Sequence, residues 1–183
     1  MAITGMTSSE VKIPTGVKAG LKGGTVTVSG KLGAVTKVFE FGRAVVNVGD
    51  SSIQLTLEMP RKAELAELNA VSSEIRSMIE GVTTGFEYRL RIVYAHFPIK
   101  VQVKGQEVII ENFLGERHPR KARIVGTAKV AVSGDQVTVT SNVIEDAGQT
   151  AANIERATRI KNYDRRVFQD GIYITSKAGR TLI

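Results

Sequence analysis

Cationic side chains that could bind phosphate are concentrated in one short stretch, residues 117–123 (RHPRKAR), which holds four cations and a histidine. Cations this close together repel one another unless anions neutralise them. Arginine suits phosphate binding because its planar guanidinium can bond two phosphate oxygens and keeps its charge at any relevant pH. Gly115 and Pro119 predict a loop for this stretch. A solvated charged loop is the alternative interpretation, and for a generic protein it would be the better one.

A second cationic group, at residues 156–166, surrounds the predicted end of a helix. Cations at that position also complement the helix dipole, so part of the group could stabilise the helix. Lys177 and Arg180 extend the positive charge into a C-terminal tail without periodicity, and the sequence leaves open whether this tail is ordered without RNA.

Catalytic and metal-binding constellations are not indicated. His96 and His118 are far apart in sequence, no nucleophile elbow accompanies either, and two histidines outside helical reach make no zinc site. His96 lies in an apolar stretch, which favours a structural histidine, whereas His118 lies among cations, which favours a phosphate contact. The glycines have neither dinucleotide-binding nor P-loop spacing, and the carboxylates form no acid–base pair. We therefore expect no enzymatic activity, no cofactor and no metal.

The charge balance favours a polyanionic partner, because 25 Lys and Arg face 18 Asp and Glu, a net charge of +7. Residues 1–97 hold 11 cations and 9 acids (+2), and residues 98–183 hold 14 and 9 (+5). Aromatic residues make up only 5%, which argues against a single-strand binder that works by base stacking and leaves phosphate contact and shape recognition of folded RNA. We expect no DNA partner.

The location is constrained by what the chain lacks. The absence of cysteine excludes disulfides and cysteine-based zinc sites, and it fits a reducing compartment such as the cytoplasm. No apolar run approaches the ~20 residues of a membrane span. The N-terminal residues have neither the basic start nor the apolar core of a signal peptide, so we expect none.

Alternating apolar and polar residues predict short strands at 25–29, 35–41, 44–48 and 53–58. An apolar stripe at helical spacing then predicts a helix near 65–83, which Gly85 ends in a left-handed conformation. A strand is predicted at 86–94. The same order recurs 82 residues later, with a second helix near 147–160 and a last strand at 171–174. Asp146 and Gln149 have the spacing of a capping box.

This repetition predicts an α+β fold made of two tandem copies of a small antiparallel sheet with one packed helix, an internal duplication. The expected boundaries are residues 1–97 for the first repeat, 98–175 for the second, and 176–183 for the basic tail. The three cationic groups all fall in the second half, so we expect that half to bind the polyanion.

Four blocks resemble the family of large-subunit ribosomal protein number six, in its archaeal and eukaryotic form. They are residues 81–99 (GVTTGFEYRLRIVYAHFPI), 111–116 (ENFLGE), 148–155 (GQTAANIE) and 164–173 (DRRVFQDGIY). The resemblance implies a duplicated fold, a place in the cytoplasmic ribosome, and binding to large-subunit ribosomal RNA near the sarcin–ricin loop, beside the landing site of the translational GTPases. It also implies neighbouring large-subunit ribosomal proteins as partners. Ser141 departs from the glycine expected in the turn before the second helix.

The expected RNA-backbone contacts are cationic or hydrogen-bonding side chains of the second half: Arg117, His118, Arg120, Lys121, Arg123, Arg156, Arg159, Lys161, Asn162, Arg165, Arg166, Lys177 and Arg180. Some of them could instead pair with Glu116, Glu155 or Asp164. Reversing the charge of Arg120 and Arg123 is expected to abolish incorporation into large subunits without changing the melting of the isolated protein. A basic interaction module outside the ribosome and an enzyme with an unrecognised site are the competing hypotheses.

Overall fold

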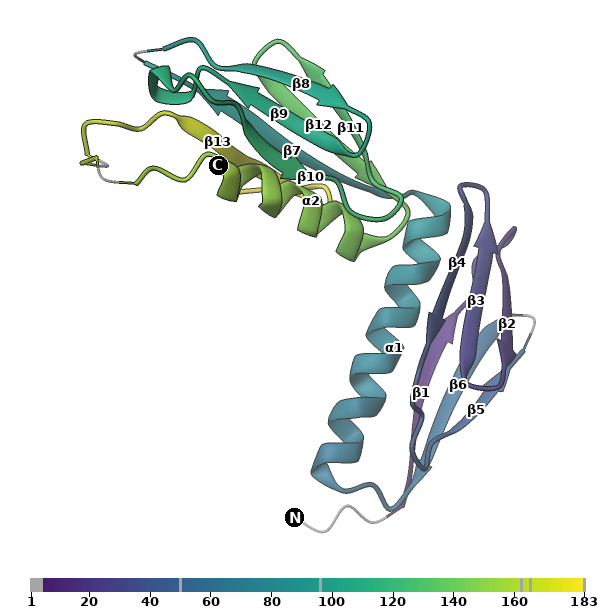
Figure 1. Cartoon of the computed structure of the whole chain (residues 1–183). Helices are drawn as coiled ribbons and strands as arrows, with labels where there is room; N and C mark the ends of the chain where they lie inside the picture. Colours follow the sequence, from purple (N-terminus) through teal and green to yellow (C-terminus); the bar gives the residue numbers. More distant parts are fainter. Residues whose placement is uncertain (1–4, 50, 96, 162, 165, 183) are drawn as a thin grey trace. The chain divides into compact units, whose positions relative to one another are not determined.

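The structure, a computed structural model, describes residues 5–49, 51–95, 97–161, 163–164 and 166–182. The chain divides into two compact units, Met1–Gly85 and Phe86–Ile183 (Figure 1). Within the described part of the chain, neither helix is long and apolar enough to cross a membrane.

The first unit contains two three-stranded antiparallel sheets and one helix, which packs against β1, β3 and β4. The strand orders are β1-β6-β5 and β2-β3-β4. The elements are β1 (Met6–Lys12), β2 (Lys18–Lys22), β3 (Thr25–Gly30), β4 (Gly33–Val38), β5 (Val45–Val48), β6 (Ser52–Glu58) and α1 (Lys62–Thr83).

The sequence patterns of this unit account for its elements. The alternation in β3 places Val26 and Val28 in the core, and the stripe on α1 buries Leu68, Ile75 and Val82. Gly85 has a φ of +73°, the left-handed conformation predicted for the residue that ends the helix. The expected stop of the first helix is therefore confirmed.

The second unit contains a five-stranded sheet of order β11-β12-β7-β13-β14, a three-stranded sheet of order β10-β9-β8, and one helix. The helix packs against β7, β10, β12 and β13. The elements are β7 (Phe86–Val93), β8 (Lys100–Lys104), β9 (Glu107–Glu111), β10 (Arg120–Arg123), β11 (Lys129–Ser133), β12 (Gln136–Ser141), α2 (Ile144–Ala157), β13 (Gly171–Lys177) and β14 (Arg180–Thr181).

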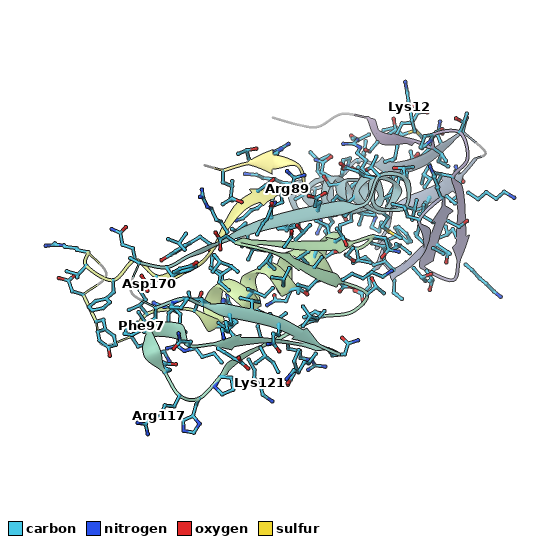
Figure 2. The ribbon with its side chains drawn as sticks, turned by 90° about the horizontal axis from the view of Figure 1, so that it is seen from above. Lys12, Arg89, Phe97, Arg117, Lys121 and Asp170 are labelled. Atoms are coloured by element: carbon cyan, nitrogen blue, oxygen red, sulfur yellow. The ribbon has the colours of Figure 1, made fainter. Side chains whose placement is uncertain are left out.

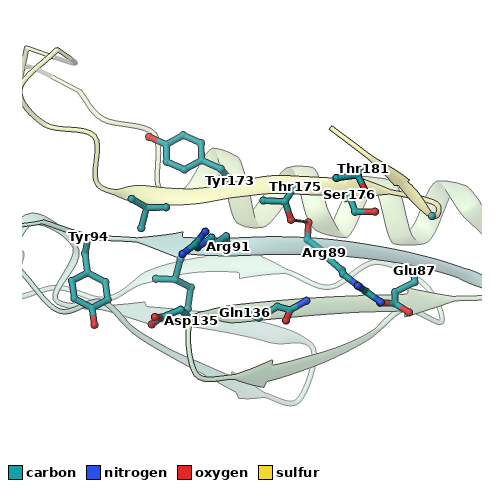
Figure 3. A pocket seen from close by; sticks show the side chains of 13 residues that line it. Glu87, Arg89, Arg91, Tyr94, Asp135, Gln136, Tyr173, Thr175, Ser176 and Thr181 are labelled. Carbon is teal, nitrogen blue, oxygen red and sulfur yellow. Dashed lines mark hydrogen bonds and ion pairs between the residues drawn. The ribbon is translucent and has the colours of Figure 1, made fainter. Parts of the chain in front are cut away.

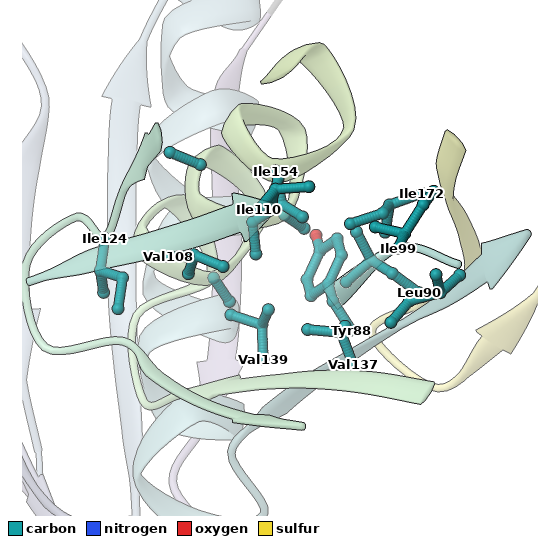
Figure 4. Close-up of a cluster of buried hydrophobic side chains, with 14 of the residues drawn as sticks. Tyr88, Leu90, Ile99, Val108, Ile110, Ile124, Val137, Val139, Ile154 and Ile172 are labelled. Carbon is teal, nitrogen blue, oxygen red and sulfur yellow. The ribbon is translucent and has the colours of Figure 1, made fainter. Parts of the chain in front are cut away.

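The core of the second unit lies between the two sheets and α2 (Figure 4). Leu90, Ile110, Val137 and Ile154 are fully buried and come from four different elements. Tyr88 points into this cluster, and its hydroxyl lies against Gly148 of α2. Because the apolar residues of each strand alternate with exposed ones, the opposite face of the five-stranded sheet remains polar.

The two units share one order of elements: a strand, a three-stranded sheet, a hairpin and a helix. β1 and β7 both pair with the second strand of the hairpin, which is β6 in the first unit and β12 in the second. The helices begin at Lys62 and Ile144, 82 residues apart. The predicted α+β class with an internal duplication is confirmed, with two sheets in each unit rather than one.

The predicted boundary at residue 97 is wrong. Phe86–Val93 does not close the first repeat, because β7 lies between β12 and β13 in the second unit. The repeat therefore begins with this strand, and β13 is an addition to the second copy that pairs with β7. Periodicity identifies a strand, but it does not identify the sheet that the strand joins.

Two further local predictions are corrected. Residues 120–123 form the edge strand β10, and only the residues before it form a loop. Asp146 does not cap α2, because the helix begins at Ile144 and the Asp146 carboxylate accepts a hydrogen bond from the Thr127 backbone N–H (3.0 Å). Ser141 takes part in the turn instead, since its Oγ accepts a hydrogen bond from Val143 N at 3.0 Å.

Candidate nucleic-acid interface

Three loops meet at one end of the second unit: residues 94–99, 112–119 and 158–170. Asp170 is fully buried, and its Oδ1 accepts a hydrogen bond from Ala95 N at 3.0 Å, which joins the third loop to the first. A Cβ on Gly115 would lie 3.4 Å from the Phe97 ring, so the second loop packs directly on the first. Figure 2 shows Phe97, Asp170 and Arg117 at this end of the unit.

The second loop has a conformation that directs its cations outward. Phe113 is buried and anchors the loop, while Asn112, Leu114 and Gly115 all have left-handed backbones, with φ of 58°, 50° and 75°. A left-handed leucine is sterically unfavourable and requires firm anchoring on both sides. Beyond this tight turn, residues 116–119 are exposed, so the side chains of 117 and 118 extend into solvent.

Arg120 is used inside the unit. Its Nε and Nη2 donate to the two carboxylate oxygens of Glu116 at 2.8 and 2.6 Å, and its Nη1 donates to the carbonyl oxygens of Ala157 and Arg159 at 2.9 and 3.0 Å. The guanidinium also lies 4.3 Å from the centroid of the Phe113 ring. Hydrogen bonding from Arg120 holds the pKa of Glu116 below its ordinary value against the opposing effect of burial. The alternative that some cations pair with Glu116 is therefore confirmed for Arg120.

This network ties β10 to the C-terminal end of α2, whose last carbonyls need donors. Reversing the charge of Arg120 should therefore lower the melting temperature of the isolated protein, because a carboxylate at 120 would face Glu116 and the carbonyls of Ala157 and Arg159. Arg120 thus stabilises the loop of residues 112–119, and the exposed cations beside it in the sequence are available to bind a ligand.

The strand β10 and the helix α2 adjoin along their length. Asn153 Nδ2 donates to the Arg123 carbonyl at 3.0 Å, and Gln149 Nε2 donates to Asn153 Oδ1 at 2.8 Å. Arg156 follows Asn153 by three residues, which places it on the neighbouring part of the helix surface. Lys121 also lies on the exposed side of β10, where its Nζ pairs with Glu107 at 3.1 Å.

We name the exposed side chains of this region the basic edge. It consists of Arg117, His118, Lys121, Arg123, Arg156 and Arg159. Within the part of the chain that the structure describes, only Lys121 of these six has an ion-pair partner. The basic edge therefore presents exposed arginines, a lysine and a histidine around one edge of a sheet, and its arginines have no ion-pair partner among the described residues.

The remaining predicted contacts divide into three groups. Lys161 and Arg166 are exposed in the loop of residues 158–170, where the rings of Tyr163 and Phe168 pack at a tilt of 55° with centroids 4.9 Å apart. Asn162, Arg165 and the predicted structural His96 lie outside the described residues.

Lys177 and Arg180 are not part of the basic edge. The two residues are opposite each other in the register of β13 and β14, and Lys177 is also opposite Tyr88 near the beginning of β7. The three loops lie beyond Val93 at the other end of this strand, roughly 17 Å away at about 3.3 Å per residue. The described part of the tail belongs to the β13–β14 hairpin, and Leu182 N donates to the Thr175 carbonyl at 2.7 Å.

Sequence reasoning missed two arginines on the outer face of the five-stranded sheet, Arg89 and Arg91, and the two amides of Gln149 and Asn153. The arginines alternate with the buried Leu90 and Ile92, so the period of two in β7 was a sufficient signal for them. No comparable signal marked the amide of Asn153, since its partner, the Arg123 carbonyl, is distant in sequence.

The corrected boundary sharpens the charge asymmetry. Residues 1–85 hold nine Lys and Arg and eight Asp and Glu, a balance of +1. Residues 86–183 hold sixteen Lys and Arg and ten Asp and Glu, a balance of +6. Almost all of the excess positive charge therefore belongs to the second unit.

Comparison with known proteins gives concordant results. The family model described as "Ribosomal protein L6" matches residues 97–171. The chain is 45% identical over 177 residues to large ribosomal subunit protein uL6 of Methanobrevibacter smithii, covering 97% of this chain and 99% of that protein. It is 46% identical to uL6 of Archaeoglobus fulgidus (91% and 88% covered) and 47% identical to uL6 of Methanocella arvoryzae (92% and 96%).

Likeness at this level extends over nearly the full length of both chains. The chain therefore belongs to the family of large ribosomal subunit protein uL6, a family of structural and non-enzymatic proteins of the cytoplasmic ribosome.

Proposed function

We propose that the second unit anchors the chain to large-subunit ribosomal RNA near the sarcin–ricin loop, beside the landing site of the translational GTPases, and that the basic edge is its main contact surface. The observation that carries this proposal is the exposed row of cations around β10, held in place by the Arg120 network. Neutralising phosphates with such a row releases condensed counterions, which provides most of the affinity of a protein for nucleic acid.

The shape of the region favours folded RNA over a featureless polyanion. The loop of residues 112–119 is rigidly built, since it is anchored by Phe113 and packed on Phe97. A rigid protruding loop with cations on one side can follow the groove or backbone turn of a structured RNA. The first unit has a net charge of only +1, so it contributes little to the attraction for RNA. Its proposed role is to contact neighbouring ribosomal proteins.

A charge-reversal pair tests the contact surface. Arg117→Glu with Arg123→Glu removes two exposed cations of the basic edge without touching the Arg120 network. We expect this double variant to melt like the wild type and to fail to co-sediment with large subunits. The matched control is Lys12→Glu with Lys18→Glu, two exposed cations of the first unit, which should retain co-sedimentation. Equal loss in both variants would show that total charge, and not the basic edge, drives binding.

Hydroxyl-radical footprinting of the large-subunit RNA tests the location. The wild type should protect nucleotides at and around the sarcin–ricin loop, and the double variant should leave them exposed. Protection confined to another region of the RNA would reject the proposed location while leaving RNA binding itself intact.

A further inference from the structure

A groove of about 1030 Å³, lined by both polar and apolar residues, lies on the outer face of the five-stranded sheet, away from the apolar core (Figure 3). Residues of β7, β12, β13 and β14 line it, and none of them belongs to the basic edge. Its size is at the upper end of the range of pockets that bind small ligands. The groove is therefore a separate feature of the second unit.

Three side chains lie in a row across the groove. Arg91 on β7 has Gln136 on β12 as its partner on one side and Tyr173 on β13 as its partner on the other. Neighbouring strands are about 4.8 Å apart, so the row spans roughly 10 Å. It brings a cation, an amide and an aromatic ring within the dimensions of a single nucleotide.

The ring of Tyr173 is fixed in position. Its hydroxyl donates to the Gln169 carbonyl at 3.1 Å, and a Cβ on Gly171 would lie 3.1 Å from the ring. Glycine at 171 thus leaves room for one side of the ring to lie on the backbone, while the ring also borders the groove. A ring that is already immobilised loses little conformational entropy when a base stacks on it.

The electrostatics of the groove suit a phosphate together with a base. Arg89 is paired with Glu87, whereas the described residues supply neither an ion pair nor a hydrogen bond to the Arg91 guanidinium. The carboxylate of Asp135 and the amide of Gln136 offer acceptors at the same end. Lys177 and Arg180, in the β13–β14 hairpin whose residues line the groove, add positive charge beside it.

We propose that this groove binds one unpaired nucleotide of ribosomal RNA, with its base stacked on Tyr173, its phosphate on Arg91 and its base edge hydrogen-bonded by Gln136 or Asp135. Stacking on an aromatic ring at the face of a sheet is a common way for proteins to hold an unstacked base. The low aromatic content of the chain is compatible with this site, because a single nucleotide needs a single ring. The choice of RNA as the ligand rests on the proposed function, whereas the site itself is separate from the basic edge.

Binding of an end-labelled single-stranded RNA hexamer to the full chain, followed by fluorescence anisotropy, tests the proposal. Tyr173→Leu should weaken binding by about 5- to 100-fold, the range found when base–aromatic stacking is lost. Tyr173→Phe keeps the ring and should stay within about 2-fold of the wild type. Arg91→Gln should weaken binding and reduce the salt slope by about 0.7, the value for one phosphate contact on a single strand.

Controls separate this site from the rest of the molecule. Arg76→Gln removes an exposed cation of α1 and should bind the hexamer like the wild type. The double variant of the basic edge should still bind the hexamer while it fails to join large subunits, so the two proposals fail independently. Unchanged binding by Tyr173→Leu would overturn the inference. Failure of the wild type to bind the hexamer would also overturn the inference. If Arg91→Gln nevertheless impaired incorporation into large subunits, the groove would be a contact for another protein and not for RNA.

Discussion

Replacing Arg120 with methionine should destabilise the second unit, although the residue lies in the middle of a cationic cluster. Methionine keeps much of the apolar contact with Phe113 but removes the whole guanidinium. Glu116 loses both of its hydrogen-bond donors, and the carbonyls of Ala157 and Arg159 lose the donor that satisfies them at the end of α2. The tie between β10 and the helix is then broken.

The magnitude follows from the exposure of each group. The Arg120 side chain is 23% exposed and that of Glu116 is 41% exposed, so solvent limits their ion pair to about 1 kcal/mol. The two hydrogen bonds to the carbonyls of Ala157 and Arg159 contribute about 0.5–1.5 kcal/mol each. Loss of the charge over the Phe113 ring adds about 0.5 kcal/mol. The free energy of unfolding should therefore fall by about 3 kcal/mol, which lowers the Tm of a unit of this size by about 10–20 °C.

Thermal unfolding of the full chain, followed by circular dichroism and calorimetry, measures this loss. Arg117→Met is the matched control, because Arg117 is exposed three residues away and its replacement should change stability by less than about 0.5 kcal/mol. A Tm for Arg120→Met within about 2 °C of the wild type would refute the reasoning, since it would mean that the guanidinium is not held by the helix carbonyls.

Three other outcomes follow from the same structure. Arg120 holds the pKa of Glu116 below its ordinary 4.5, so the stabilisation from their pair is complete above that value and is lost as the pH falls through the lowered pKa. The difference in stability between the wild type and Arg120→Met should therefore narrow in acid. Urea unfolding at a series of pH values measures this difference. Gly126→Ala should lower the free energy of unfolding by about 2–3 kcal/mol, because its Cβ would displace the Asp146 carboxylate and its φ is +54°. Gly134→Ala, with a φ of +57° and no atom within 4 Å, should lower it by only about 1 kcal/mol. Equal losses of stability in chemical denaturation would contradict the role of the carboxylate. Binding to large-subunit RNA should weaken with salt at a log–log slope of roughly −0.7 to −0.9 per phosphate contact. The double reversal of Arg117 and Arg123 should make this slope shallower by about 1.5. An unchanged slope in a salt titration would place those two cations outside the interface.

Much of the architecture was contained in local patterns. The alternation at Val26 and Val28 predicted a strand, and the stripe from Leu68 to Val82 predicted a helix, because both depend on residues that are neighbours along the chain. The offset of 82 residues predicted the duplication for the same reason, since a repeated unit repeats its local pattern. The concentration of cations in the second half was likewise visible in the sequence and pointed to the unit proposed to bind RNA.

The roles of individual side chains were decided only by the tertiary structure. Arg120 and Arg123 are alike in the sequence, but Arg120 faces Glu116 and the end of α2 whereas Arg123 faces solvent. Lys177 and Arg180 belong to the same basic half, but the pairing of β13 with β7 carries them to the far end of the sheet. Composition and spacing determine which charges are present and how near they are along the chain. Which of them remain free for a ligand depends on partners distant in sequence, and only folding brings those partners together.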